Sequence, residues 1–144
     1  MKTEYKRFWA LVLFVSLALA GIAQAEIVVV TNKSNKLHGI TLPELGKLYL
    51  AQNKSFSNGK RAMVADYPPG TPLRGEFYKK VLKMSDKEVS RYWAKRKFTR
   101  KIKPPRKISG EVEMKQWVAS TPNSLGYIDG KSLDSSVKVL LIIP

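Results

Sequence analysis

Few side chains in this sequence of 144 residues could carry out covalent or metal chemistry. The chain has no cysteine, which excludes thiolate nucleophiles, disulfides and cysteine-ligated metal sites. Its one histidine, His38, lies in a polar stretch with no acidic neighbour, so a Ser-His-Asp arrangement is not indicated and an exposed surface histidine is favoured. We therefore expect a protein that is not an enzyme and that holds no metal or cofactor.

The carboxylates give no indication of acid–base catalysis either. Asp86 with Glu88, and Glu111 with Glu113, fall at predicted helix starts, where the helix dipole already accounts for acidic residues. Asp129 and Asp134 are separate from both pairs, and no glycine-rich nucleotide-binding loop occurs.

Positive charge is the most unusual chemical feature. The chain carries 26 Lys and Arg against 11 Asp and Glu, and eight of these cations lie between residues 95 and 107, a stretch without an acid. Such a run is either a solvated surface or a docking site for an anionic partner. Its members are Lys95, Arg96, Lys97, Arg100, Lys101, Lys103, Arg106 and Lys107.

The N-terminal residues 1–25 have the pattern of a secretory signal. Three cations precede an uncharged stretch of 15 residues, too short for the roughly 20 that cross a bilayer, and Ala23-Gln24-Ala25 fits a signal-peptidase site. A cleaved signal peptide is favoured over an uncleaved anchor. We expect a periplasmic protein without a lipoprotein cysteine and with a net charge of about +13 after cleavage. That location disfavours nucleic acid as the anionic partner and favours lipid headgroups, envelope polyanions or an acidic protein face.

The elements that must position these residues alternate between strand and helix along 26–144, which we predict to be one domain. Apolar, β-branched runs predict buried strands, and Thr-Pro and Ser-x-x-Glu patterns predict capped helix starts. The strands are expected at 26–31, 62–65, 125–128 and 137–143, and the helices after Thr41, Thr71, Ser85 and Gly110. This order predicts an α/β fold, a small central sheet flanked by about four helices.

Several motifs resemble the phosphate-binding proteins of bacterial phosphate ABC transporters, which have the type 2 periplasmic binding protein fold. The most specific is the run from Pro122 to Ile128, which is similar to the family's Pro-Gly-Ala-Ile-Gly-Tyr run after a helix. Others are the Thr41 to Leu45 helix start and the Gly70-Thr71 helix start with Phe77. The resemblance covers nearly all of 26–144 but only one of the family's two lobes.

The resemblance also implies a ligand site. In the family, an arginine ends a strand and a Gly-Ser-Gly-Thr turn opens a helix whose N–H groups and hydroxyls hold phosphate. The ungapped match places Gly70, Thr71, Pro72 and Leu73 on that turn and Tyr67 at the arginine. Pro72 lacks an N–H, and Tyr67 lacks the charge of a guanidinium.

The expected ligand-binding residues therefore have alternative interpretations. The donors that remain for an anion are the Thr71 hydroxyl, the N–H groups of Leu73 and Arg74, and the Arg74 side chain. Alternatively, residues 70–72 form a plain helix cap without a ligand, and Arg74 is a surface residue. Thr31 and Asn32, which follow the first strand, could line the same edge or belong to an exposed loop.

Two functions are compatible with these residues. The first is a secreted phosphate-transporter-like binding lobe that holds phosphate or another small oxyanion, with a second copy or an envelope protein completing the cleft. The second is a ligand-free envelope adaptor or sensor subunit that binds an anionic protein or membrane surface through the basic segment.

Overall fold

The computed structural model describes residues 25–99 and 102–144. The predicted signal segment, apart from Ala25, lies outside the described residues, as do Arg100 and Lys101. In the described part of the chain, no helix is both long enough and apolar enough to span a membrane.

A five-stranded mixed sheet with the order β3-β2-β4-β1-β5 forms the centre. β2 runs parallel to both β3 and β4, whereas β1 runs antiparallel to β4 and β5. The strands are β1 (Ile27–Thr31), β2 (Met63–Asp66), β3 (Arg106–Lys107), β4 (Ser124–Asp129) and β5 (Lys138–Ile143).

The two-residue strand β3 was not expected, because both of its side chains are charged and exposed. It forms by pairing with Ala65 and Asp66, a contact that hydrophobic patterning does not report.

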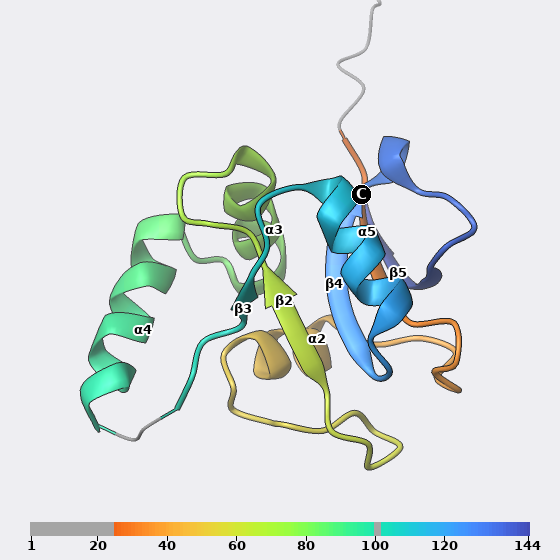
Figure 1. The fold of residues 1–144 in the computed structure, drawn as a ribbon. Coiled ribbons are helices and arrows are strands. Elements are labelled where there is room, and N and C mark those ends of the chain that lie inside the picture. The colour runs from red at the N-terminus through yellow and green to blue at the C-terminus, as the bar shows by residue number, and fades with distance from the viewer. Residues whose placement is uncertain (1–24, 100–101) are drawn as a thin grey trace, which may run out of the picture.

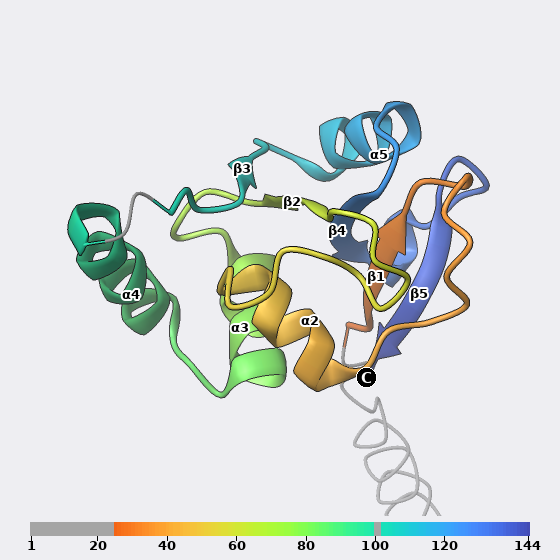
Figure 2. The same ribbon diagram turned by 90° about the horizontal axis from the view of Figure 1, so that it is seen from below.

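Helices cover both faces of the sheet. Figures 1 and 2 show α5 on one face and α2 and α3 on the other, with α4 packed beside α3 beyond the β3 edge. Their bounds are α2 (Leu42–Tyr49), α3 (Pro72–Leu82), α4 (Asp86–Thr99) and α5 (Glu111–Ser120), with a short 3-10 turn, η1, at Gly130–Ser132. The predicted α/β class and the helix count are confirmed.

An aromatic cluster joins α2 and α3 to the sheet. The Phe77 ring stacks on that of Tyr127 with centroids 3.8 Å apart and contacts Tyr49 at 4.7 Å. On the other face Gly126 allows α5 to approach, since a Cβ there would lie 2.6 Å from the Met114 sulfur. The sheet and its aromatic cluster therefore fix where β2 ends and α3 begins.

The predicted capping boxes are present at two helix starts. The Thr41 N–H donates to Glu44 (2.9 Å) and the Glu44 N–H to the Thr41 hydroxyl (3.3 Å). At the start of α4, the Ser85 N–H donates to Glu88 (2.6 Å) and the Glu88 N–H to the Ser85 hydroxyl (3.1 Å). Hydrogen bonds from the backbone N–H groups of Thr41 and Ser85 lower the pKa of Glu44 and of Glu88 below the ordinary value.

These capping bonds predict how stability depends on pH. A carboxylate whose pKa is lower in the folded state stabilises the fold above its unfolded pKa, and that stability is lost as pH falls through the folded pKa. We expect Glu44→Gln with Glu88→Gln to melt at a lower temperature than the parent at pH 7 and to lose less stability on acidification. Thermal melts followed by circular dichroism from pH 7 downward measure this. Parallel curves for the two proteins would contradict it.

Candidate functional site

The turn between β2 and α3 contains most of the predicted ligand residues. β2 ends at Asp66, and Gly70 adopts a left-handed conformation with φ of 89°, which glycine accommodates without strain. The Thr71 hydroxyl does not cap α3. It donates instead to the carbonyl oxygen of Pro68 at 2.8 Å, so it is engaged within its own turn.

A carboxylate of the protein itself lies at this helix start. Asp86, the first residue of α4, accepts a hydrogen bond from the Gly70 N–H at 2.6 Å and forms an ion pair with Nη1 of Arg74. The resemblance would place an oxyanion against these same donors. Sequence reasoning assigned Asp86 only to the start of its own helix and missed this long-range contact.

Arg74 is buried, with 1% of its surface exposed. Its Nε donates to Oδ2 of Asp66 at 3.1 Å, and its guanidinium lies 5.1 Å from the Tyr78 ring centroid. The interpretation of Arg74 as a surface residue is therefore wrong. The backbone turn brings Arg74 inward, where two carboxylates satisfy its charge.

Asp66 is the centre of a buried polar cluster. Its two oxygens accept hydrogen bonds from the hydroxyls of Tyr78 and Tyr127, each at 2.6 Å, from Nε of Arg74, and from the N–H of Tyr67 at 2.8 Å. Burial, together with the negative charge of Asp66, raises the pKa of both tyrosine hydroxyls, which stay protonated as donors. Sequence reasoning missed Asp66; the only available signal was an acid ending an apolar strand.

Tyr67, which occupies the position of the family's arginine, is directed into the core. It is 1% exposed, and its hydroxyl donates to the carbonyl oxygen of Tyr127 at 2.8 Å. Burial raises its pKa, so the hydroxyl remains a neutral donor. The Tyr67 side chain therefore ties the end of β2 to β4. Unlike an arginine at this position, it adds no positive charge to the turn.

Thr31 and Asn32 lie at the opposite end of the sheet from Gly70. Because β1 is antiparallel to β4, and β4 is parallel to β2, the carboxyl end of β1 meets the amino ends of these strands. Thr31 donates to the Ser124 carbonyl oxygen (2.5 Å), and Asn32 donates to that of Val118 (3.0 Å). The prediction that they line the same edge as Gly70 is wrong for this topological reason. They tie β1 to β4 and α5.

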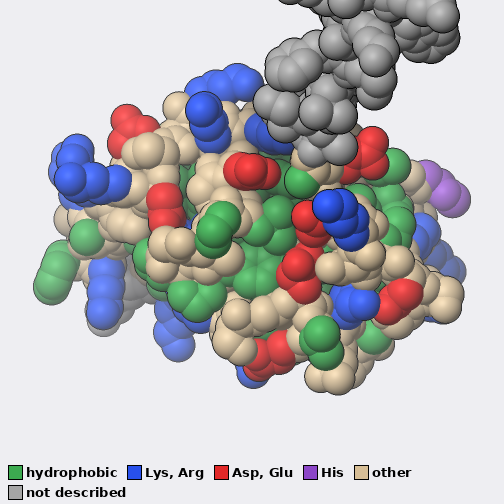
Figure 3. Space-filling view, turned by 90° about the horizontal axis from the view of Figure 1, so that it is seen from above, with side chains coloured by type: hydrophobic (Ala, Val, Ile, Leu, Met, Phe, Trp, Pro, Cys, Tyr) green, Lys and Arg blue, Asp and Glu red, His purple; other side chains and the backbone are tan. Residues whose placement is uncertain are grey.

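The face onto which the Pro68–Gly70 turn opens carries side chains of both signs. In Figure 3, which looks onto that end of the molecule, Asp and Glu side chains are spread across its middle, with Lys and Arg side chains among them and around the rim. Glu111 there accepts the N–H of Asp129 at 2.6 Å. Among the described residues, no group of three or more His, Asp or Glu could hold a metal ion.

The described members of the basic run lie on α4 and on the segment after it. Lys95, Arg96 and Lys97 are in the last turns of α4, where Arg96 stacks on Tyr92 at 4.6 Å. The Lys107 ammonium lies 3.9 Å from Oδ2 of Asp66, and the partial burial of this otherwise exposed side chain lowers its pKa, with Arg74 acting in the same direction and Asp66 opposing. Lys95 and Lys97 are thus exposed to solvent, whereas Lys107 lies at the edge of the buried Asp66 cluster.

Comparison with known proteins identifies the fold. No family model matches this chain, and no curated protein matches it by sequence. An ABC-type phosphate transport receptor from Vibrio cholerae superposes with a TM-score of 0.64 at 18% identity, covering 81% of this chain and 45% of the receptor. PstS from Borrelia burgdorferi superposes with a TM-score of 0.60 at 13% identity, covering 81% of this chain and 46% of that protein. The fold matches part of a phosphate transport receptor, as predicted, and the chain spans less than half the length of these neighbours.

Proposed function

We infer that this protein is a non-catalytic recognition lobe, built on the phosphate-receptor fold, that binds an anionic partner and does not capture free phosphate. The observation that carries this inference is Asp86. Its carboxylate accepts the Gly70 N–H and pairs with Arg74, the donors that an oxyanion would need at the start of α3. Of the other expected donors, the Thr71 hydroxyl is used by Pro68, and Tyr67 is buried.

Electrostatics support the same function. A free phosphate bound to Arg74 would lie close to the carboxylates of Asp86 and Asp66, which both pair with Arg74. Repulsion between these negative charges opposes binding. By contrast, the basic surface on α4 and the following segment has exposed cations, which attract an anionic partner at long range. We also propose a periplasmic location, which rests on the sequence pattern of residues 1–25. That segment, apart from Ala25, lies outside the described residues.

A second candidate function is capture of phosphate by displacement of Asp86. It is favoured by the likeness to a phosphate transport receptor and by the surviving geometry of the Gly70 N–H and Arg74. In that case a second copy or an envelope protein would have to complete the cleft, because the chain spans 45% of that receptor.

Substitution of Asp86 separates the two functions. Asp86→Ala vacates the start of α3 and leaves Arg74 with one carboxylate partner, so we expect phosphate to raise the melting temperature of this variant and not of the parent. A phosphate concentration of 100 Kd would stabilise the variant by about 2.7 kcal/mol. Calorimetric titration at low salt gives the affinity directly.

Asp134→Ala is the matched control. It removes the same charge from an exposed carboxylate that pairs with Lys115, far along the chain from α3. We expect no phosphate response from it. Binding of phosphate by the parent would overturn the inference.

A further inference from the structure

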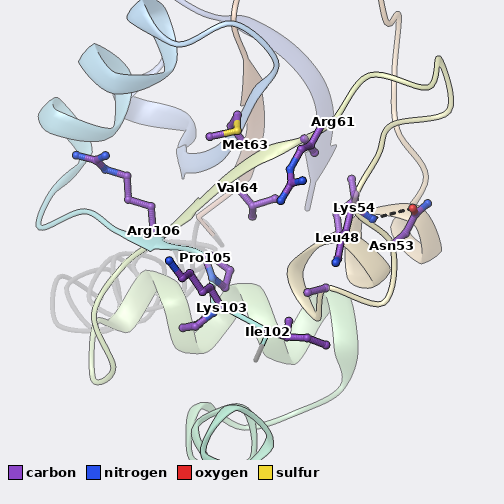
Figure 4. Close-up of a pocket in the computed structure, with 13 residues that line it drawn as sticks. Leu48, Asn53, Lys54, Arg61, Met63, Val64, Ile102, Lys103, Pro105 and Arg106 are labelled. Carbon is purple, nitrogen blue, oxygen red and sulfur yellow. Dashed lines mark hydrogen bonds between the residues drawn. The ribbon is translucent and has the colours of Figure 1, made fainter. Parts of the chain in front are cut away.

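A cationic groove lies at the outer edge of β2, away from the α3 start. Its volume is about 500 Å³, and Lys54, Arg61, Lys103 and Arg106 line it together with apolar residues and Asn53. Figure 4 shows Lys54 and Arg61 on one side of this groove and Lys103 and Arg106 on the other. No Asp or Glu lines it.

The four cations of the cationic groove form no ion pair within the described residues, in contrast to Arg74 and Lys107. Glu113 is an acidic neighbour of Arg106: hydrogen bonds from Ser109 lower the pKa of Glu113, and Arg106 acts in the same direction. Two of the four cations precede β2 and two belong to the predicted basic run, so the fold joins cations that are 42 to 52 residues apart in sequence. A concave, single-sign surface focuses the field and raises the local concentration of an anionic ligand.

The floor of the cationic groove is apolar. Leu48, Val64 and Ile102 contribute to it, and Met63 is 46% exposed. A free phosphate or a polyphosphate would leave this surface in water. A ligand that carries both apolar and acidic groups would cover it, and burial of that area adds to affinity.

The cationic groove also coincides with an interruption in the pairing of β2. The Ala62 N–H donates to the carbonyl oxygen of Lys54 at 2.9 Å, and β3 pairs only with Ala65 and Asp66. On this side Val64 lies between these two contacts. A gap of this length offers the backbone of a ligand a hydrogen bond or two beside Val64, not a whole strand edge.

We propose that the cationic groove binds a short, extended, acidic peptide segment of a partner protein, whose apolar side chains cover the floor and whose carboxylates meet the four cations. A peptide supplies carboxylates for the cations, apolar side chains for the floor and backbone groups for the short gap beside Val64. This proposal rests on the proposed function, for which it names the site and the partner chemistry.

The test uses a short fluorescein-labelled peptide of alternating glutamate and leucine, with fluorescence anisotropy as the readout. In the groove variant, Lys54→Gln, Arg61→Gln, Lys103→Gln and Arg106→Gln are combined. In the control variant, four exposed lysines outside the cationic groove are replaced with glutamine: Lys33, Lys36, Lys79 and Lys131. Both variants carry the same net charge, and circular dichroism melts establish that both fold.

We expect the groove variant to bind the peptide at least about tenfold more weakly than the parent, and the control variant to bind within about threefold of the parent. A version of the peptide with glutamine in place of glutamate should bind weakly to all three proteins. Direct binding of inorganic tripolyphosphate, by calorimetric titration, and of phosphatidylglycerol vesicles, by co-sedimentation, tests the other anionic occupants.

Equal loss of affinity in both variants would overturn the groove as the site while leaving recognition of an anionic partner intact. Binding of tripolyphosphate or vesicles without binding of the peptide would overturn the peptide as the occupant. The phosphate titration of Asp86→Ala decides the proposed function separately, because Asp86 does not line the cationic groove.

Discussion

Replacement of Asp66 with alanine is expected to lower the free energy of unfolding by about 3–5 kcal/mol. The substitution removes a fully buried carboxylate and leaves the guanidinium of Arg74, which is 1% exposed, without its inner partner. It also leaves the hydroxyls of Tyr78 and Tyr127 without the acceptor that each now meets at 2.6 Å. Urea denaturation followed by circular dichroism measures the loss.

Two further variants keep this prediction testable if Asp66→Ala does not fold. Asp66→Asn retains an acceptor for the tyrosines and removes only the charge, so it should cost less than Asp66→Ala. Adding Arg74→Met to Asp66→Asn removes both partners of the pair, and the double variant should be more stable than the sum of the single effects predicts. A cost below about 1 kcal/mol for Asp66→Ala would show that the cluster is not a determinant of stability.

Replacement of Phe77 with alanine is expected to cost about 3–5 kcal/mol of unfolding free energy. The ring is fully buried, stacks on that of Tyr127 with centroids 3.8 Å apart, and lies 4.7 Å from that of Tyr49. Its removal leaves a cavity between α3 and the sheet, directly beneath the Asp66 cluster. Denaturant melts would detect the loss, and Phe77→Leu should recover part of it.

Phe98→Ala is the matched control for Phe77→Ala. The same atoms are deleted from a ring that is 89% exposed in the last turn of α4, so the stability should change by no more than about 0.5 kcal/mol. Similar costs for Phe77→Ala and Phe98→Ala would contradict the aromatic core described above.

The relation between Asp86 and α3 has a consequence for how this fold can change its function. A receptor that closes on an oxyanion needs empty donors at a helix start, whereas here a carboxylate only twelve residues after Arg74 supplies the anion from within the chain. Because Asp86 belongs to the same chain, its carboxylate is always close to the Gly70 N–H and Arg74, and free phosphate would have to displace it to bind there. Under the proposed function, the same helix start contributes to stability instead of ligand capture.

The sequence by itself determined the α/β class, two of the capped helix starts and most of the strands, because these depend on periodicity and on residues three or four positions apart. The predicted Thr71 cap of α3 was wrong, because the Thr71 hydroxyl donates to Pro68 instead. The Thr41–Glu44 and Ser85–Glu88 boxes are such local features, and both are present. It also showed that the chain has neither a thiolate nor a second histidine for catalysis.

The tertiary structure decided the candidate sites, because each depends on contacts between segments far apart in the chain. The antiparallel direction of β1 separates Thr31 from Gly70, which no local pattern reports. Burial of Arg74 follows from where Asp66 and Asp86 meet it, and the cationic groove forms only when Arg61 and Arg106 lie on two sides of one hollow. Charge along the sequence shows how many cations there are; only the fold decides which of them face a carboxylate of the chain and which do not.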